Sequence, residues 1–374
     1  MSFTDTVLAP GTLDATALRE LVSSGAIVAP GGVPEAQIQP ASIDLTLAEE
    51  GYRLPGSILP LAGETVRDLV RHLALEAIEL SRPLCLGRDQ VYLIRLRERL
   101  ALPPGLEAYT NSKSSTGRVD LATRVLADGS SRYDRIPAGY AGDLWIELIP
   151  RSFNIVAEVG VSLNQAIFFH ERQVLGQHDL AGLHRDHGLL RDDRGDAVPA
   201  ERCCFDGRLV MTADLSRDVV GYLAKPTHKP LVLTKLRGHA VGDFFAPLQR
   251  PASGYLFLEK DRFYILATAE RVAVPADLAC EMVPYDAASG EFRAHYAGFF
   301  DPGWGIAADG RCRGTRAVLE VRSHEEDLIL RHGQPICAMA YERLQRPCND
   351  LYGQRGNTYV DQDGPVLSKH FSRG

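Results

Sequence analysis

The chain is poor in the features that mark membrane proteins and disulfide-stabilised proteins. Its 374 residues include seven Cys, four Met and two Trp. No apolar run approaches the roughly 20 residues that a transmembrane helix needs. The first residues, Met1–Thr6, form neither the basic nor the apolar part of a secretory signal. We therefore expect a cytoplasmic protein that has no membrane partner.

The cysteines also argue against structural zinc. Their number is odd, they are scattered, and none forms a C-x-x-C pair. Reduced thiols in a chain that is long enough to bury a core are the simplest explanation. His178, His184 and His187 lie close together, but their spacing matches no recognised ligand set, so we interpret them as polar surface.

Charge and length limit the partners and the organisation. A net charge of −7 argues against nucleic acid, because a phosphate backbone is bound by a basic face. A local basic pocket for one small anion remains compatible with that charge. The apolar content of 45% is that of a globular protein, and the length suggests two domains.

The apolar patterns predict a few short helices before a β-rich chain. Residues 12–25 indicate a helix with Thr12 as its N-cap, and residues 38–47 alternate as a half-buried strand does. A second helix is expected at 64–79. From about residue 83 onward, short apolar runs separated by Gly and Pro are typical of an all-β barrel or sandwich.

An internal repeat indicates two copies of one β domain. The run Tyr92–Leu106 reappears at Tyr264–Leu278 with Tyr, Glu-Arg, Ala, Pro and Leu in place. We predict a first domain at 1–174, a polar connection at 175–210 and a second domain at 211–374.

Two further stretches indicate the same relation between the copies. Trp145-Ile-Glu-Leu corresponds to Val318-Leu-Glu-Val, and we expect Asp243–Leu248 to match the Ser-Ile-Asp-Leu strand of the first copy.

The stretch Asn111–Arg118 has the composition of an anion site. It reads Asn-Ser-Lys-Ser-Ser-Thr-Gly-Arg, with four hydroxyl side chains, one Gly and two cations. Hydroxyls and backbone N–H groups at a tight turn, together with Lys and Arg, suit a phosphate chain. A polar surface loop is the alternative.

Four motifs in order resemble one family. They are Ile38-Gln-Pro-Ala-Ser-Ile-Asp-Leu, Lys113-Ser-Ser-Thr-Gly-Arg, Trp145-Ile-Glu and the tail Tyr359-Val-Asp-Gln-Asp-Gly-Pro-Val-Leu-Ser. The chain resembles the dCTP deaminases, relatives of the trimeric dUTPases, and in particular their long bacterial form. The resemblance implies two tandem dUTPase-like distorted β-barrel (β-clip) domains and hydrolysis of dCTP to dUTP and ammonia.

The resemblance also implies site residues and partners. Mg²⁺ rides on the triphosphate, no zinc and no metal ligand from the protein are used, dTTP inhibits, and the chain is a homo-oligomer, a dimer or trimer. A Glu of the hairpin strand moves protons, and the tail closes over the nucleotide. The implied contacts are Lys113, Ser114, Ser115, Arg118, Asp301, Tyr352 and Gln362, with Glu147 and Glu320 both at the catalytic Glu position.

The chemistry agrees with a hydrolytic deaminase that uses a carboxylate. Attack of water on C4 of cytosine needs a base and then an acid, and a buried carboxylate of raised pKa supplies both. A hydroxyl orients the water and Arg favours the developing negative charge. Zinc deaminases instead carry H-x-E together with P-C-x-x-C, whereas this sequence has His170 and Glu171 adjacent and contains no P-C-x-x-C.

The two copies have lost different parts of the site. The second copy has Ala287, Ala288 and Glu291 where the first has its phosphate segment. The first copy has Pro137-Ala-Gly where the second has Asp301-Pro-Gly, after a polar insertion near 128–135. We therefore expect a composite site in which Lys113–Arg118 act with Asp301, Glu320, Tyr352 and Gln362, with Glu147 as the rival proton shuttle.

The tail departs from the family at one position. Thr358 stands where a Lys is usual, so that Arg355 or Lys369 is a candidate replacement. A dUTPase or a bifunctional deaminase and diphosphatase is the nearest alternative function, since these relatives share the phosphate loop. A non-catalytic nucleotide-binding regulator is the second alternative.

Overall fold

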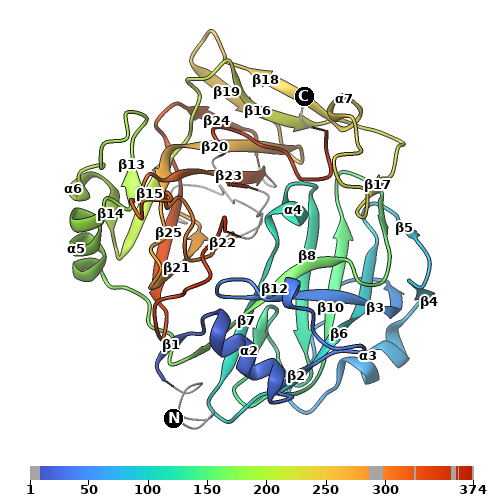
Figure 1. Ribbon diagram of the computed structural model, residues 1–374. Helices are drawn as coiled ribbons and strands as arrows, with labels where there is room; N and C mark the ends of the chain where they lie inside the picture. The colour runs from blue at the N-terminus through green and yellow to red at the C-terminus, as the bar shows by residue number, and fades with distance from the viewer. Residues whose placement is uncertain (1–8, 286–297, 324–325, 355–358, 361, 373–374) are drawn as a thin grey trace. The chain divides into compact units, whose positions relative to one another are not determined.

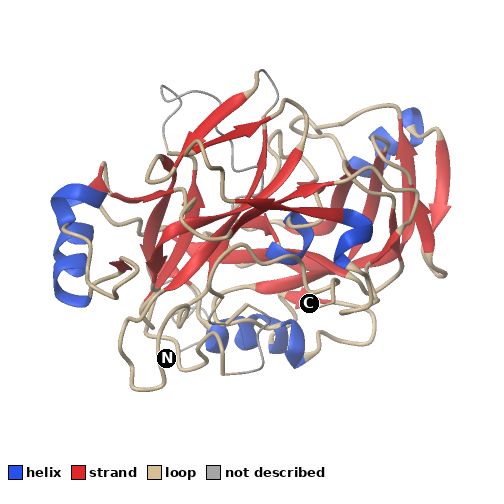
Figure 2. Cartoon of the chain, turned by 90° about the horizontal axis from the view of Figure 1, so that it is seen from above, coloured by secondary structure: helices blue, strands red, loops and turns tan. Residues whose placement is uncertain are grey.

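The computed structural model describes residues 9–285, 298–323, 326–354, 359–360 and 362–372. The chain divides into two compact units. Unit 1 comprises Met1–Arg172, Pro226–Ala240 and Ser368–Gly374, and unit 2 comprises Gln173–Lys225 and Val241–Leu367. Strands dominate both units and the helices are short (Figure 2), which confirms the predicted mainly β fold.

A ten-stranded sheet is the centre of unit 1. The strands of this unit are β1 (Gly11–Thr12), β2 (Ile27–Val28), β3 (Ile43–Leu54), β4 (Glu76–Glu79), β5 (Leu84–Leu86), β6 (Val91–Ala101), β7 (Glu107–Ser112), β8 (Leu121–Ala127), β9 (Arg135–Ile136), β10 (Ala141–Pro150), β11 (Ile155–Ala157), β12 (Ser162–His170) and β17 (Leu231–Val232). The main sheet runs β8-β10-β6-β3-β12-β7-β9, with β1, β2 and β4 attached, and a small sheet runs β17-β11-β5. Figure 1 shows β6, β8 and β10 side by side. The helices are α2 (Ala15–Ser23), η1 (Glu35–Gln37), α3 (Val66–Leu73) and α4 (Ser114–Gly117).

Among its described residues, unit 2 holds two five-stranded sheets and one two-stranded sheet. Its strands are β13 (Leu190–Arg191), β14 (Cys204–Phe205), β15 (Arg208–Thr212), β16 (Val219–Ala224), β18 (Phe245–Gln249), β19 (Tyr255–Leu258), β20 (Phe263–Val272), β21 (Leu278–Val283), β22 (Phe299–Phe300), β23 (Thr315–Arg322), β24 (Leu328–Arg331) and β25 (Pro335–Arg343). One sheet runs β13-β20-β16-β18 with β23 on β20, the other runs β14-β15-β25-β21-β22, and β19 pairs with β24. The helices are α5 (Gln177–His187), α6 (Ala200–Cys203) and α7 (Val241–Phe244).

Strand registers confirm the internal duplication. Glu147 of β10 lies opposite Leu93 of β6, and Glu320 of β23 lies opposite Ile265 of β20, at the equivalent position of the repeat. The pairs β12–β7 and β25–β21 likewise correspond to each other. The two glutamates therefore occupy the same place in the two copies.

The repeated Glu-Arg dipeptide has a structural role in each copy. The carboxylate of Glu98 accepts hydrogen bonds from the backbone N and the Oγ1 of Thr46, at 2.8 and 2.6 Å. Glu270 accepts the same two bonds from Thr212, both at 2.7 Å. Each carboxylate satisfies a buried donor pair, which burial would otherwise make costly. Thr212 of β15 is thus the counterpart of Thr46 of β3.

This correspondence corrects one alignment made from sequence. Asp243–Leu248 was expected to match the Ser-Ile-Asp-Leu strand, but these residues form α7 and most of β18. Strand β18 pairs with β16 as β4 pairs with β3. The Phe-Phe-Ala-Pro-Leu run resembles a strand because β18 is one, at a different position of the copy.

Residues 175–210 differ from the polar connection that was expected. Helix α5 turns Leu180 and His184, four residues apart, toward the interior, and both are buried. Leu190 and Cys203 belong to the same apolar core as the strands of unit 2. The many Asp and Arg of this stretch obscure the sparse apolar positions, so the sequence alone indicated a solvated segment.

Two helix boundaries also differ from the prediction. Helix α2 starts at Ala15, because Asp14 caps it by accepting a bond from the N–H of Ala17 at 3.2 Å, while Thr12 belongs to β1. The helix expected at 64–79 ends at Leu73, and the remainder becomes β4.

Candidate functional site

The predicted phosphate segment forms a single helical turn between two strands of unit 1. Strand β7 leads into α4, and β8 follows it. The turn closes through bonds from Gly117 N to Lys113 O, at 3.1 Å, and from Arg118 N to Ser114 O, at 3.0 Å. Ser115 and Arg118 are buried, whereas Lys113 and Ser114 are half-buried. The four predicted residues therefore lie together on one turn.

The basic side chain at the start of this turn has an acidic partner. Lys113 Nζ forms an ion pair with Asp44 Oδ2 of β3. Asp44 is buried, and its position in the Ile-Gln-Pro-Ala-Ser-Ile-Asp-Leu motif was noted without a role. Only a long-range contact between β3 and α4 reveals that it positions Lys113.

The C-terminal segment of the chain returns to the same turn. Ser368 Oγ lies 2.8 Å from the carbonyl oxygen of Ser115 and 2.8 Å from Nδ1 of His370. The backbone of this segment is held by bonds from Arg237 N to Lys369 O, at 3.0 Å, and from His239 N to His370 O, at 3.1 Å. Residues 368–370 are thus part of the wall around the phosphate segment.

Glu147, the first hairpin glutamate, is covered by its own unit. It is 1% exposed, accepts a bond from Ser57 Oγ at 3.0 Å, and lies 3.7 Å from Arg124. Tyr133, from the insertion near 128–135, bonds to the carbonyl of Ile58 at 2.8 Å. Burial raises the pKa of Glu147, and the bonds to Ser57 and the Arg124 charge oppose that rise. Ser57 and Arg124 both approach Oε1, while the other oxygen, Oε2, is buried with no hydrogen-bond partner among the described residues.

In unit 2 the Asp-Pro-Gly turn packs against the tail. The carbonyl of Asp301 accepts from Trp304 N at 3.1 Å, and the carbonyl of Pro302 accepts from Tyr352 N at 2.8 Å. The rings of Trp304 and Tyr352 lie 5.0 Å apart. Gly303 has a φ of 95°, and a Cβ there would lie 2.7 Å from the backbone N of Tyr352, so this turn requires glycine.

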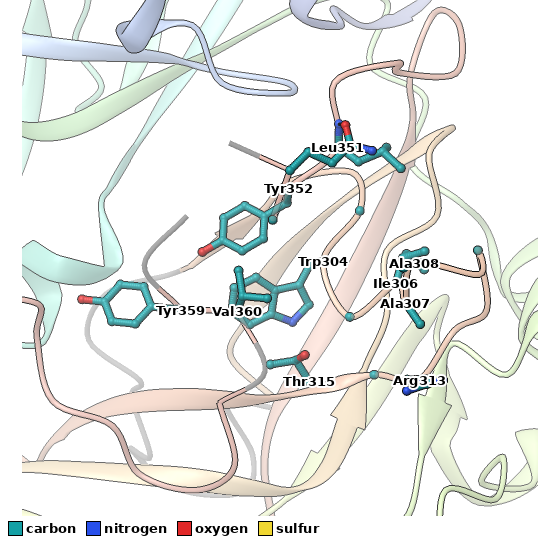
Figure 3. A pocket seen from close by; sticks show the side chains of 16 residues that line it. Trp304, Ile306, Ala307, Ala308, Arg313, Thr315, Leu351, Tyr352, Tyr359 and Val360 are labelled. Carbon is teal, nitrogen blue, oxygen red and sulfur yellow. The ribbon is translucent and has the colours of Figure 1, made fainter. Parts of the chain in front are cut away.

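A cavity of about 420 Å³ opens beside this turn. Figure 3 shows the Trp304 indole at its centre, with Tyr352 and Tyr359 on one side and Ile306, Ala307 and Ala308 on the other. Trp304 is 6% exposed, and its Nε1 has no hydrogen-bond partner among the described residues. The cavity offers an aromatic wall and the indole N–H donor of Trp304. Of the predicted site residues, Tyr352 alone is among those that line it.

Glu320 and Gln362 both lie at β23. Glu320 is 5% exposed on that strand, and Gln362 Nε2 donates to the carbonyl of Arg316 at 2.7 Å. Arg316 is fully buried, pairs with Asp214 at 3.2 Å, and pairs with Asp363 of the tail at 3.2 Å. The tail is therefore fixed to the strand that carries the second hairpin glutamate.

Unit 1 thus gathers Lys113, Ser114, Ser115, Arg118 and Glu147, and unit 2 gathers the other predicted residues. The sequence analysis gave no role to Asp44, which lies inside a quoted motif, or to Trp304, which directly follows the quoted Asp301-Pro-Gly turn. The remaining sequence-based interpretations lie outside the described residues: Ala287, Ala288, Glu291, Arg355 and Thr358.

Within the described ranges, no group of three or more His, Cys, Asp and Glu side chains is arranged to hold a metal ion. His184 was expected at the surface, but it is buried and its Nε2 lies 2.5 Å from the carbonyl of Val198. All seven cysteines lie in the described ranges and are free thiols. None of the described helices has the length and apolarity to cross a bilayer.

The chain contains two copies of one β domain. The first copy carries a turn rich in cations and hydroxyls, and the second carries an aromatic hairpin and the tail, which together define a tandem protein of the dUTPase-like class. Family models narrow this class. The N-terminal domain of 2′-deoxycytidine 5′-triphosphate deaminase (DCD) matches residues 9–172, and the DCD C-terminal domain matches residues 177–371. The chain belongs to the dCTP deaminase family, which confirms the resemblance drawn from its motifs.

Individual relatives agree with the family models. The crystal structure of 2′-deoxycytidine 5′-triphosphate deaminase from Agrobacterium tumefaciens is similar with a TM-score of 0.84 and 37% identity, over 92% of this chain and 99% of that chain. A dCTP deaminase of Haloarcula marismortui is 32% identical over 139 residues, which are 36% of this chain and 67% of that protein. A dCTP deaminase of Natronomonas pharaonis is 29% identical over the same shares.

Proposed function

We propose that the chain catalyses hydrolytic deamination of dCTP to dUTP and ammonia, with a carboxylate as its proton shuttle. Water adds to C4 of cytosine, N3 and then the exocyclic nitrogen take up protons, and the C4–N bond breaks to release ammonia. The observation that carries the proposal is the helical turn that groups Lys113, Ser114, Ser115 and Arg118, inside a chain whose two halves match deaminase domain models.

The turn in unit 1 suits the triphosphate. Two cations and two hydroxyls surround it, and its acidic neighbour Asp44 is paired with Lys113. Such a donor set fits an anion better than a metal ion. We assign Mg²⁺ to the triphosphate itself, where it neutralises phosphate charge when bound, with no zinc in the reaction.

Glu320 is the proton shuttle in this proposal. It shares unit 2 with Asp301, Tyr352 and Gln362, the other residues assigned to the nucleoside and tail contacts. Its counterpart Glu147 is bonded to Ser57 and enclosed by the insertion of its own copy. Because side chains of its own copy fill the space beside Glu147, a cytosine ring has no room to approach this carboxylate.

Separation of products tests the reaction. Incubation with dCTP and Mg²⁺ should yield dUTP and ammonia in equal amounts. Formation of dUMP and pyrophosphate would assign the bifunctional activity, and cleavage of dUTP with unchanged dCTP would assign a dUTPase. Tight binding of dCTP with no product would refute an enzyme and favour a regulator.

Glutamine substitution tests the shuttle, since it keeps the shape of the side chain and removes its titrating group. Glu320→Gln should abolish deamination, whereas Glu147→Gln should retain it. The two variants are matched controls for each other, because both residues are buried at the same position of the repeat. The reverse outcome would assign catalysis to the first copy.

The remaining assignments follow from the same function. We propose that the enzyme acts in the cytoplasm as a homo-oligomer, a dimer or trimer, and that dTTP inhibits it by competing for the triphosphate contacts. Light scattering and inhibition of dCTP turnover by dTTP test these assignments.

A further inference from the structure

The two copies differ at the residue that faces the arginine of the repeated Glu-Arg dipeptide. In the first copy Arg99 lies opposite Asp143, and the two side chains form an ion pair at 3.5 Å. In the second copy the equivalent residues are Arg271 and Arg316, which lie opposite each other where the register of the ladder shifts in the same way. Like charges that face each other across a ladder destabilise a sheet. The second copy therefore favours an anion beside these two arginines.

Asp363 of the tail supplies that anion. Its Oδ1 accepts from Arg271 Nη2 at 2.6 Å and from Arg316 Nε at 3.2 Å. Arg217 adds a bidentate pair, with Nη2 2.9 Å from Oδ1 and Nη1 3.2 Å from Oδ2. Burial raises the pKa of Asp363, but the neighbouring guanidinium groups outweigh burial and hold that pKa below its ordinary value. Arg217, Arg271 and Arg316, the arginine cluster, thus converge on one carboxylate within unit 2.

Residues outside the tail hold two of these arginines in place. Arg316 is fully buried and donates to the carbonyls of Thr268 and Ala269, both at 2.5 Å. Asp214, which is also buried, lies 3.2 Å from Arg316 and accepts a bond from Arg217 Nε at 2.9 Å. The arginine cluster is therefore preorganised, which reduces the entropy cost of binding a carboxylate.

We propose that Asp363 is the positioning residue of the tail, which it docks on the arginine cluster before the nucleotide binds. The preceding residue, Gln362, donates from Nε2 to the carbonyl of Arg316 at 2.7 Å, so two consecutive residues fix the tail to β23. Glu320 lies four residues farther along this strand, roughly 13 Å away at about 3.3 Å per residue. The inference rests on the proposed function, because docking presents the tail to the site that holds Glu320.

Hydrogen exchange without substrate measures the docking directly. In Asp363→Asn the tail peptide that contains position 363 should exchange roughly 10-fold faster, the order expected when one carboxylate loses three half-exposed ion pairs. Strand β25 of the same unit should keep its rate, which separates release of the tail from unfolding of unit 2. Asp363→Glu keeps the charge and should restore most of the protection. Asp218→Asn removes an exposed carboxylate of the same unit, 3.8 Å from Arg250, and is the matched control that should exchange as the wild type does.

Salt and kinetics give two further measurements. In the wild type, raising NaCl from about 50 to about 500 mM should speed exchange of the tail peptide, because salt screens half-exposed ion pairs, and Asp363→Asn should lose this dependence. In steady-state turnover, Asp363→Asn should raise the KM for dCTP and leave kcat within about twofold, because saturating substrate restores the docked tail.

The outcomes separate this proposal from the proposed function. Unchanged exchange of the tail peptide in Asp363→Asn would overturn the inference, as would an unchanged KM or an equal acceleration in β25, which would make Asp363 a purely structural residue. If that variant does not fold, a wild-type tail whose exchange ignores salt would overturn it. Failure of the wild type to deaminate dCTP would instead refute the proposed function, and the exchange result would stand by itself.

Discussion

Lowering the pH from 7 to 5 should decrease the free energy of unfolding of unit 1, because His370 is buried as a neutral side chain. This side chain is 4% exposed and lies between Ser368, whose Oγ is 2.8 Å from Nδ1, and the backbone of Leu233. Burial lowers the pKa of His370 to about 4, and the charges of Lys369 and His239 lower it in the same direction. The hydrogen bond with Leu233 opposes them and is the smaller effect.

The sign and size of the effect follow from the pKa shift. A histidine with a folded-state pKa of about 4 stays neutral at pH 5, while the unfolded chain, with a pKa of 6.5, binds a proton. The contribution of neutral His370 to the unfolding free energy is therefore fully present above pH 6.5, and it is lost as the pH falls from 6.5 to about 4. At 1.36 kcal/mol for each pH unit, the loss is about 2 kcal/mol at pH 5 and about 3 kcal/mol below pH 4.

Urea unfolding of the wild type and of His370→Asn measures this loss. Trp145 lies in unit 1 and Trp304 in unit 2, so a Trp304→Phe background leaves one fluorescent reporter for unit 1. The change in unfolding free energy from pH 7 to pH 5 should be smaller in His370→Asn by about 2 kcal/mol. Asp134, whose pKa burial raises to about 6, contributes equally in both proteins and cancels.

Two results would refute this reasoning. Equal pH dependence in the two proteins would mean that His370 does not titrate differently on folding. A wild type that gains stability relative to His370→Asn on acidification would mean that Ser368 and Leu233 hold an imidazolium, with a pKa above 6.5.

The other predictions concern the turn at Lys113–Arg118 and metals. Arg118→Ala should abolish deamination in a steady-state assay, because this buried cation lies in the turn that we propose binds phosphates; near-normal activity would reduce the segment to a structural loop. Ser114→Ala should leave the unfolding curve unchanged and slow turnover by a factor on the order of 10²–10³, as for loss of one oriented polar group. A zinc-specific chelator should leave activity intact when Mg²⁺ is supplied, and stoichiometric zinc whose removal stops turnover would contradict the mechanism.

The repeat and the strand patterns were predictable because their information is local. In the second half of Val91–Ala101 buried and more exposed residues alternate with the period of two of a half-buried strand, and the first six residues of Phe263–Val272 form a continuously buried run. The turn at Lys113–Arg118 was equally visible, since its hydroxyls and cations are adjacent in sequence.

Contacts that join distant residues were not predictable in the same way. The ion pair of Lys113 with Asp44 and the bond of Ser368 to Ser115 depend on which strands become neighbours. The interior face of α5 was hidden for a different reason, because only Leu180 and His184 point inward among many charged neighbours.

The two hairpin glutamates show why position in a repeat does not settle function. Both are buried and lie at the same place in their ladders, so neither sequence nor register distinguishes them. The two glutamates differ in the residues that surround them. Ser57 and the insertion that carries Tyr133 fill the space beside Glu147, whereas Gln362 of the tail donates a hydrogen bond to the strand that carries Glu320. A duplicated enzyme needs only one shuttle, and at Glu147 the hydroxyl of Ser57 and the cation of Arg124 offset the cost of burying Oε1, while Oε2 has no hydrogen-bond partner among the described residues. If Glu320 is the shuttle, as proposed, Glu147 serves the fold of the first copy, and removal of Ser57 should destabilise unit 1 without opening a second active site.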